Sequence, residues 1–294
     1  MVATIEYIEQ VIETYRKAAE ANRQTPTRKG NVVVLTREDA DDVMITADLH
    51  GNRRNFNAIR TIAALDANPR RHLILQEVCH GGPTYPNSGG CMSHTMLEDV
   101  ARLKARYPDR VHFLLSNHEL AELTDYPIVK SGRMLNLLFR LGMQEIYGPA
   151  TEKVRQAYAD FLRSLPLAVS LPGGVFVCHT LPEEVDRHGF ETAVFERPLE
   201  PLDLREHGVV FKLVWGRDFR EENAQAFAGL VGASVLIHGH EPCGGKGFCV
   251  PNQTQIILDC CSQQAGYLIL PTDVEWTHEK VVERIRDLGE GSGQ

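Results

Sequence analysis

Val43-Met44-Ile45-Thr46-Ala47, followed directly by Asp48-Leu49-His50-Gly51, is the stretch on which the fold prediction depends. A short run of apolar and β-branched residues, with the acidic cluster Glu38–Asp42 before it, is typical of a buried strand. Asp48 and His50 can both point at one ion just past the strand end, because Gly51 lets the backbone turn away. A surface turn with a capping aspartate would have the same sequence, so this stretch alone does not establish a site.

Four later apolar runs end in the same kind of residue. They are residues 75–82, 114–119, 175–179 and 235–240, and each finishes with side chains that bind metals or move protons. Open α/β sheets gather their chemistry outside the carboxyl ends of the strands. Five such junctions in succession therefore predict one site that is assembled from several loops.

The composition is that of an ordinary globular protein. The 294 residues are 43% hydrophobic and 24% charged, and the net charge of −8 argues against non-specific binding to nucleic acid or an anionic membrane. No apolar run approaches the length of a membrane span, and the first residues have no signal-peptide pattern. Seven cysteines without regular spacing indicate reduced thiols. We therefore expect a cytoplasmic protein that binds neither a membrane nor a nucleic-acid scaffold.

The order of elements predicts an α/β fold. Alternating apolar spacing indicates a strand–helix–strand rhythm after an amphipathic N-terminal helix at residues 5–21. The predicted helices are 55–65 and 94–106, and the predicted strands are 31–35, 43–47, 72–75, 111–115, 165–169, 175–178, 235–237, 255–258 and 267–270. Residues 120–165 read as a long helical insertion that covers one side of the site and carries no candidate ligand. Without repeats or a linker, residues 1–294 are expected to form one domain.

The order of the motifs resembles the calcineurin-like metallophosphoesterases. Asp-x-His-Gly comes first, followed by a strand-end acid, Asn117-His118-Glu119, a lone strand-end His179, and Gly239-His240. Residues 165–167 and 213–218 are similar to the phosphoprotein phosphatase branch, which includes diadenosine tetraphosphate hydrolases. The resemblance covers residues 43–270. It implies two mixed β-sheets packed as a sandwich and flanked by helices, with a dinuclear metal centre at one end.

The resemblance also implies a role for each motif residue. Two divalent ions would be held, one by Asp48 and His50, the other by Asn117, His179 and His240, with Glu77 bridging them and His118 as the general acid. Imidazole and carboxylate ligands suit Mn²⁺, Fe²⁺ or Zn²⁺. Two such ions lower the pKa of a shared water and clamp a displacement at phosphorus.

The second motif departs from the family pattern Gly-Asp-x-x-Asp-Arg-Gly, since residues 76–82 read Gln-Glu-Val-Cys-His-Gly-Gly. Glu77 keeps a carboxylate but is one methylene longer than the family's aspartate. Gly81 stands where the family has an arginine that grips phosphate. The candidate replacement cations are Arg53, Arg54, Arg217 and Arg220, and for each of them a solvated surface charge is the competing interpretation.

His80 stands at the second aspartate of that motif, which in the family partners the catalytic histidine. An imidazole cannot supply the same fixed negative charge, so His118 should lose its proton at lower pH than in a relative with the aspartate. The expectation holds unless another carboxylate, for instance Glu119 or Asp259, has taken the vacant role.

Three functions remain open on the sequence alone. The first is a metal-dependent phosphoesterase acting on a phosphorylated substrate, either a phosphomonoester (phosphoprotein or small molecule) or a nucleoside polyphosphate. The second is a metal-binding member of the same fold with weakened catalysis that serves as a binding module. The third is a metalloenzyme that uses the same centre for a different hydrolysis.

Overall fold

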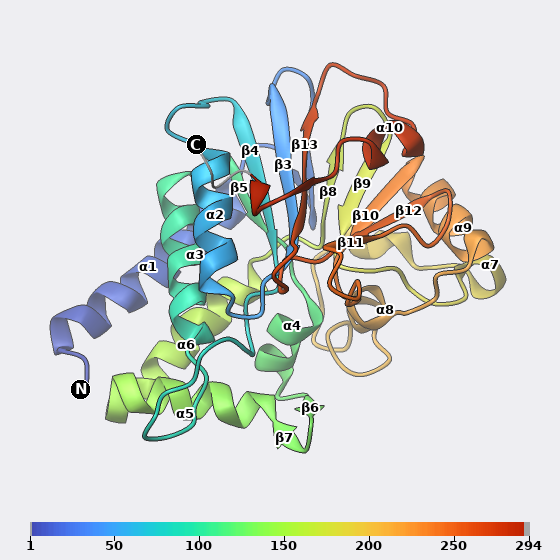
Figure 1. The fold of residues 1–294 in the computed structure, drawn as a ribbon. Coiled ribbons are helices and arrows are strands. Elements are labelled where there is room, and N and C mark those ends of the chain that lie inside the picture. The colour runs from blue at the N-terminus through green and yellow to red at the C-terminus, as the bar shows by residue number, and fades with distance from the viewer. Residues whose placement is uncertain (1, 291–294) are drawn as a thin grey trace.

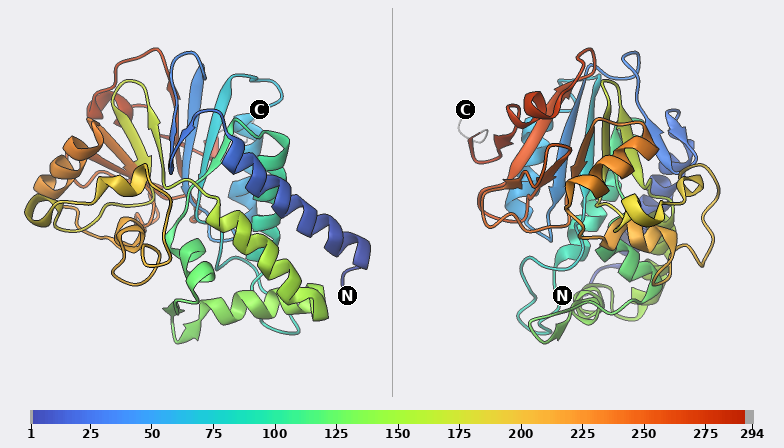
Figure 2. Two further views of the ribbon diagram at one scale, coloured as in Figure 1. Left: turned by 180° about the vertical axis from the view of Figure 1, so that it is seen from behind. Right: turned by 90° about the vertical axis from the view of Figure 1, so that its right-hand side faces the viewer.

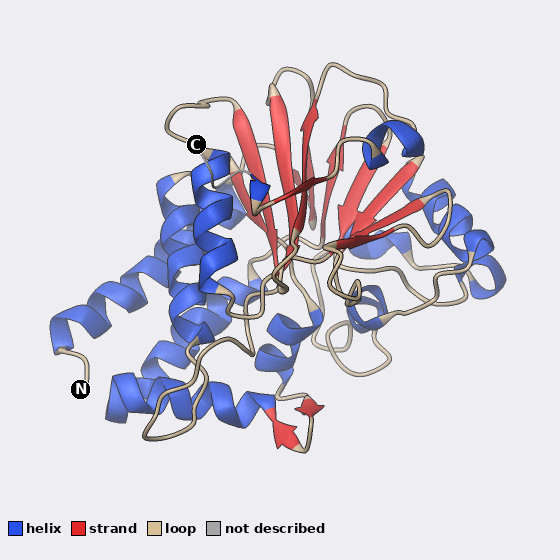
Figure 3. Ribbon diagram, in the orientation of Figure 1, coloured by secondary structure: helices blue, strands red, loops and turns tan. Residues whose placement is uncertain are grey.

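The computed structural model describes residues 2–290, and its centre is a pair of β-sheets flanked by helices (Figures 1 and 3). The first sheet has the order β14 (Arg286–Asp287), β13 (Gly266–Pro271), β3 (Asp42–Asp48), β4 (Arg71–Gln76) and β5 (Val111–Phe113). The second has the order β1 (Arg28–Lys29), β2 (Val32–Val34), β8 (Ala168–Leu171), β9 (Val175–Cys178), β10 (Val235–His238), β12 (Gln255–Leu258) and β11 (Phe248–Cys249). Both sheets mix parallel and antiparallel pairs, which confirms the predicted fold class.

The strand β3, which contains the apolar run Val43–Ala47, lies inside the first sheet. β3 pairs in parallel with β4 and antiparallel with β13. Its residues Val43, Met44, Ile45 and Ala47 are fully buried. A strand covered on both faces reads as a continuous apolar run, and this is why the pattern was recognisable in the sequence.

The helices surround this pair of sheets. They are α1 (Ile5–Gln24), α2 (Arg53–Ala63), α3 (Ser93–Arg106), α4 (Asn117–Thr124), α5 (Leu135–Tyr147), α6 (Thr151–Arg163), α7 (Val185–His188), α8 (Val209–Trp215), α9 (Glu221–Val231) and α10 (His278–Val282). Residues 120–165, predicted to be helical, contain most of α4, all of α5 and α6, and a small hairpin of β6 (Val129–Lys130) and β7 (Arg133–Met134). The N-terminal helix α1 packs along α3 and α6, as the view from behind shows (Figure 2). No helix within residues 2–290 is long and apolar enough to cross a bilayer.

Parallel pairing fixes where the site forms. β3, β4 and β5 run in the same direction, and so do β9, β10 and β12 in the other sheet. The carboxyl ends of each parallel set therefore meet at one edge, where α4 lies directly below the sheets in Figure 1.

A buried lysine lies between α1 and α3. Lys104 is 1% exposed, and its Nζ donates to Thr25 Oγ1 at 2.9 Å and to the Pro108 carbonyl oxygen. Burial, reinforced by the Arg28 charge and opposed by Asp109, lowers the pKa of Lys104 from 10.5 to about 7. The folded protein therefore binds fewer protons at this site than the unfolded chain between these two values.

Lys104→Met is expected to remove a pH dependence of stability. Between pH 7 and pH 10 the unfolded chain holds the Lys104 proton and the folded chain does not, so this residue makes the free energy of unfolding rise with pH. The wild type should therefore gain stability relative to Lys104→Met over that range, by an amount on the order of a few kcal/mol. Urea unfolding of both proteins at several pH values measures the difference, and parallel stability curves would contradict the assignment.

Candidate metal centre and catalytic site

The structure brings all six predicted metal ligands together at the carboxyl ends of the strands. Each comes from the end of a strand or from the turn that follows it. Asp48 ends β3 and His50 follows in its turn, Glu77 follows β4, Asn117 begins α4 after β5, His179 follows β9, and His240 lies just beyond β10. All of them except His50 are buried, and the His50 side chain is 23% exposed.

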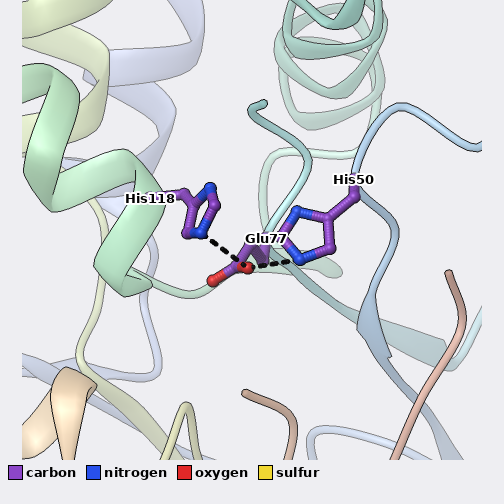
Figure 4. A group of neighbouring side chains, drawn as sticks. All are labelled: His50, Glu77 and His118. Carbon is purple, nitrogen blue, oxygen red and sulfur yellow. Dashed lines mark ion pairs between the residues drawn. The ribbon is translucent and has the colours of Figure 1, made fainter. Parts of the chain in front are cut away.

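Glu77 lies at the centre of this cluster. Its Oε1 is 2.9 Å from His50 Nε2 and 3.7 Å from His118 Nε2 (Figure 4). Its Oε2 is 3.0 Å from His179 Nε2. Two groups of potential metal ligands result, His50–Glu77–His118 and Glu77–His179–His240, and in each the ligand atoms lie within 4.8 Å of one another. Glu77 is the residue common to both groups.

The second group continues through Asn117. Its Oδ1 is 2.7 Å from His179 Nε2 and 3.2 Å from His240 Nδ1. Asp48 reaches the same group, because its Oδ2 accepts a hydrogen bond of 2.8 Å from the backbone N–H of His240. Oxygen and nitrogen ligand atoms from both sheets thus converge on one buried volume.

Three polar atoms in the cluster fit a role as metal ligands. Within the part of the chain that the structure describes, Asp48 Oδ1 and His240 Nε2 are buried without a hydrogen-bond partner, and the buried Glu77 Oε2 has the His179 ring nitrogen at 3.0 Å. A buried carboxylate oxygen without a partner is costly, and a bound cation removes that cost. The donor set of carboxylate, imidazole and amide oxygen is the one that borderline divalent ions accept. The residues therefore fit a metal centre.

The charges in the cluster are unbalanced. Burial, and after it the neighbouring Glu77 charge, raises the pKa of Asp48 to about 7. Burial also acts to raise the pKa of Glu77, but the surrounding imidazoles lower it well below its ordinary range, His118 most strongly. Asp48 and Glu77 are thus two carboxylates that share one buried volume and the same few balancing positive charges. A divalent cation next to both carboxylates would let both remain ionised.

Backbone strain concentrates at the same turns. Among residues 2–290, nine residues other than glycine have a positive φ. Four of them belong to the candidate site: His50 at 42°, Glu77 at 32°, His80 at 61° and His240 at 69°. Such conformations cost energy in residues with a side chain, and they persist where a required side-chain direction depends on them.

The close approach of two site loops explains the missing arginine of the second motif. Gly81 has a φ of 133°, and a Cβ added there would lie 2.6 Å from the backbone oxygen of His50. On the next residue, a Cβ at Gly82 would lie 2.5 Å from the backbone oxygen of Gly51. The two loops are packed backbone to backbone, so no arginine can stand at position 81 without moving His50.

Two of the four candidate arginines are held by carboxylates outside the cluster. Arg53 pairs with Asp99 on α3 and donates to Thr95 Oγ1 at 2.8 Å. Arg220 makes a two-point contact with Asp186, with N–O distances of 2.9 and 3.0 Å.

The other two arginines have different surroundings. Arg217 pairs with Glu241, the residue after His240. The pKa of His240 is well below its ordinary value, mainly because of burial, and the Arg217 charge contributes to the shift. Arg54 lines a separate cavity together with Asp287.

Glu122 is a functional candidate that the sequence patterns did not predict. His80 Nδ1 lies 2.9 Å from His118 Nδ1, and His80 Nε2 lies 2.8 Å from Glu122 Oε1. The two carboxylates named in advance have other partners, since Glu119 accepts the backbone N–H groups of residues 78 and 79, and Asp259 accepts those of residues 243 and 261. The available signal was spacing, because Glu122 is four residues after His118 on one helix and therefore on the same face.

Comparison with known proteins agrees with this geometry. Residues 42–244 match the calcineurin-like phosphoesterase family. Among solved structures, a protein serine/threonine phosphatase from Saccharomyces cerevisiae is 15% identical, with a TM-score of 0.61 and coverage of 90% of this chain and 82% of that one. A cold-active protein-tyrosine phosphatase from a Shewanella species is 13% identical, with a TM-score of 0.58 and coverage of 92% and 84%. No curated protein matches the sequence.

The chain belongs to the calcineurin-like phosphoesterase family, since the match covers more than half of its length. The solved structures are too distant in sequence to show more than a shared fold.

Proposed function

We propose that this protein hydrolyses a phosphate ester with a metal-activated water, the substrate being a phosphomonoester or a nucleoside polyphosphate. The observation that carries the proposal is the position of Glu77, which is shared by two groups of potential metal ligands. A carboxylate with two oxygens can contact two ions at once, and a shared carboxylate is what a dinuclear centre requires.

The ligand roles follow from the contacts. Asp48 and His50 would hold one divalent ion, Mn²⁺, Fe²⁺ or Zn²⁺, while Asn117, His179 and His240 would hold the other. Asn117 Oδ1 already lies within 3.2 Å of ring nitrogens of both histidines of its group, so little movement is needed for the three to share an ion. When bound, the two ions would supply a water of lowered pKa and neutralise charge on the phosphoryl oxygens.

The chain's own residues would position and protonate the substrate. His118 Nε2 faces the cluster, 3.7 Å from Glu77 Oε1, so a proton on Nε2 is placed to pass to the leaving oxygen. Arg217 is our candidate for the phosphate contact, because its charge acts on His240 and its guanidinium pairs with Glu241, the residue after His240.

A cavity beside the centre offers room for the rest of the substrate. It has a volume of about 850 Å³ and is lined by Trp215, Phe211 and Phe190 together with Glu183 and Glu184. The proposed metal ligands do not line this cavity, but the ring of its lining residue Trp215 lies 6.2 Å from the His240 ring. We propose that it receives the part of the substrate that lies beyond the phosphate.

Elemental analysis and turnover together test the function. The wild type supplemented with Mn²⁺, Zn²⁺ or Fe²⁺ is expected to hold two ions per chain and to hydrolyse p-nitrophenyl phosphate or bis-p-nitrophenyl phosphate. Asp48→Asn and His240→Ala should lose metal and at least about 100-fold in kcat together, since each removes a ligand and loss of an outer partner alone costs 10- to 100-fold. A protein that remains metal-free after supplementation would contradict the proposal.

The same assay distinguishes an active phosphoesterase from the alternative function, a binding module. Gly81 in place of the phosphate-gripping arginine favours a family member that binds metal and ligand with weakened catalysis. Two bound ions with no turnover of either ester, together with binding of inorganic phosphate, would identify such a binding module.

A further inference from the structure

The general acid proposed above has a hydrogen-bonded partner that leads away from the metal cluster. His118, His80 and Glu122 form a row in which the two imidazoles meet through their Nδ1 atoms at 2.9 Å and His80 Nε2 meets Glu122 Oε1 at 2.8 Å. The side chains of His80 and Glu122 are fully buried. Water therefore does not compete for these contacts.

The carboxylate at the end of the row is firmly held. Glu122 Oε1 also accepts from Asn136 Nδ2 at 3.2 Å, and Oε2 accepts from the Tyr158 hydroxyl at 2.9 Å. Asn136 belongs to α5 and Tyr158 to α6, so both helices of the segment predicted to lack ligands hold this one carboxylate. Three donors from three elements fix its position relative to His80.

The hydrogen-bond partners then determine which ring nitrogens of His80 and His118 carry protons. An ionised carboxylate only accepts, so His80 must carry a proton on Nε2. When the two imidazoles share one positive charge, one proton lies between the two Nδ1 atoms and the last proton lies on His118 Nε2. That nitrogen is the one that faces Glu77 and the metal ligands.

We propose that Glu122 is a positioning residue that acts through His80 to keep the proton-donating Nε2 of His118 directed at the leaving oxygen. The proposal rests on the phosphoesterase function proposed above. As the bond from phosphorus to the leaving oxygen breaks, the Nε2 proton passes to that oxygen and the His118–His80 pair becomes neutral.

This arrangement replaces the aspartate that the family places beside its catalytic histidine. The negative charge is one residue further from His118, and an imidazole transmits its effect. The arrangement also assigns a role to the helical segment after α4, because α5 and α6 hold the Glu122 carboxylate in place.

Substrates with different leaving groups test the role. Phenol is a poor leaving group and needs the proton, while p-nitrophenol leaves without much help. Glu122→Gln keeps the size of the side chain and removes its charge. It should reduce kcat for phenyl phosphate about 10- to 100-fold and change kcat for p-nitrophenyl phosphate much less.

A matched control is available in Glu98, a second buried glutamate whose Oε1 lies 3.5 Å from a histidine nitrogen, His94 Nδ1, outside the row. Glu98→Gln should leave the ratio of the two rates unchanged. In a His118→Gln background, Glu122→Gln should have no further effect on that ratio, because its influence passes through His118.

Nitrogen-15 NMR of the metal-free protein gives a readout that does not depend on activity. In the wild type His80 should carry its proton on Nε2, and in Glu122→Gln the tautomers of His80 and His118 should become mixed. Equal losses on both esters with unchanged tautomers would overturn the positioning role. A wild type that hydrolyses neither ester would contradict the proposed function, and the tautomers would still decide whether Glu122 orders the two imidazoles.

Discussion

Glu77→Gln is expected to lose metal and at least about 100-fold in kcat. Glu77 is the residue that both ligand groups share, and glutamine would bring no negative charge to either ion. Glu77→Asp should retain more metal and more activity, because it keeps the charge and matches the residue type of the family. Elemental analysis and kcat for p-nitrophenyl phosphate measure both changes.

A buried carboxylate outside the cluster serves as the control for Glu77. Asp259 is 3% exposed and accepts the backbone N–H groups of Cys243 and Cys261 at 3.2 and 2.9 Å. Asp259→Asn should therefore affect stability without removing metal. Full metal content and an unchanged rate in Glu77→Gln would show that Glu77 is only an acid at a strand end.

The parts of the fold that could be predicted from sequence are those whose burial shows in local pattern. β3 was recognisable because both of its faces are covered, and α1 because one face of its 3.6-residue period is apolar. The convergence of the candidate ligands could also be predicted from the sequence, since each candidate follows a strand and parallel strands bring their ends to one edge.

What escaped the sequence depends on contacts between distant segments. In the sequence, Glu122 looks like an ordinary acidic residue of a helix. Its role shows only in the fold, where the loop after β4 brings His80 into contact with it. Arg220 looks like a free cation in the sequence, but in the structure it pairs with Asp186, more than thirty residues earlier, as well as with the nearby Asp218. Spacing along the chain carries no information about such partners, so it could supply candidate residues but not choose among them.

The absent arginine of the second motif has the same kind of explanation. Glycine at position 81 is favoured by its φ of 133° and by the backbone oxygen of His50, which the packing of two loops brings within 2.6 Å of where a Cβ would stand. Loss of the arginine is therefore tied to the close approach of the loops that carry His50 and His80.

His118→Gln is expected to keep both metal ions and to lose about 100- to 10,000-fold in kcat for phenyl phosphate, which is the range that a general acid contributes. The measurement is needed because His118 Nε2 lies near enough to Glu77 and His50 to count as a potential ligand in the first group. Its contact with Glu77 is nevertheless the longer one, 3.7 Å against 2.9 Å for His50.

The second ring nitrogen of His118 favours the acid role. Nδ1 is taken up by His80, so only Nε2 faces the cluster, and a metal-bound Nε2 could carry no proton. Elemental analysis of His118→Gln separates the two roles. Two ions with a greatly reduced rate on phenyl phosphate would assign His118 to proton transfer, and loss of one ion would assign it to the metal centre.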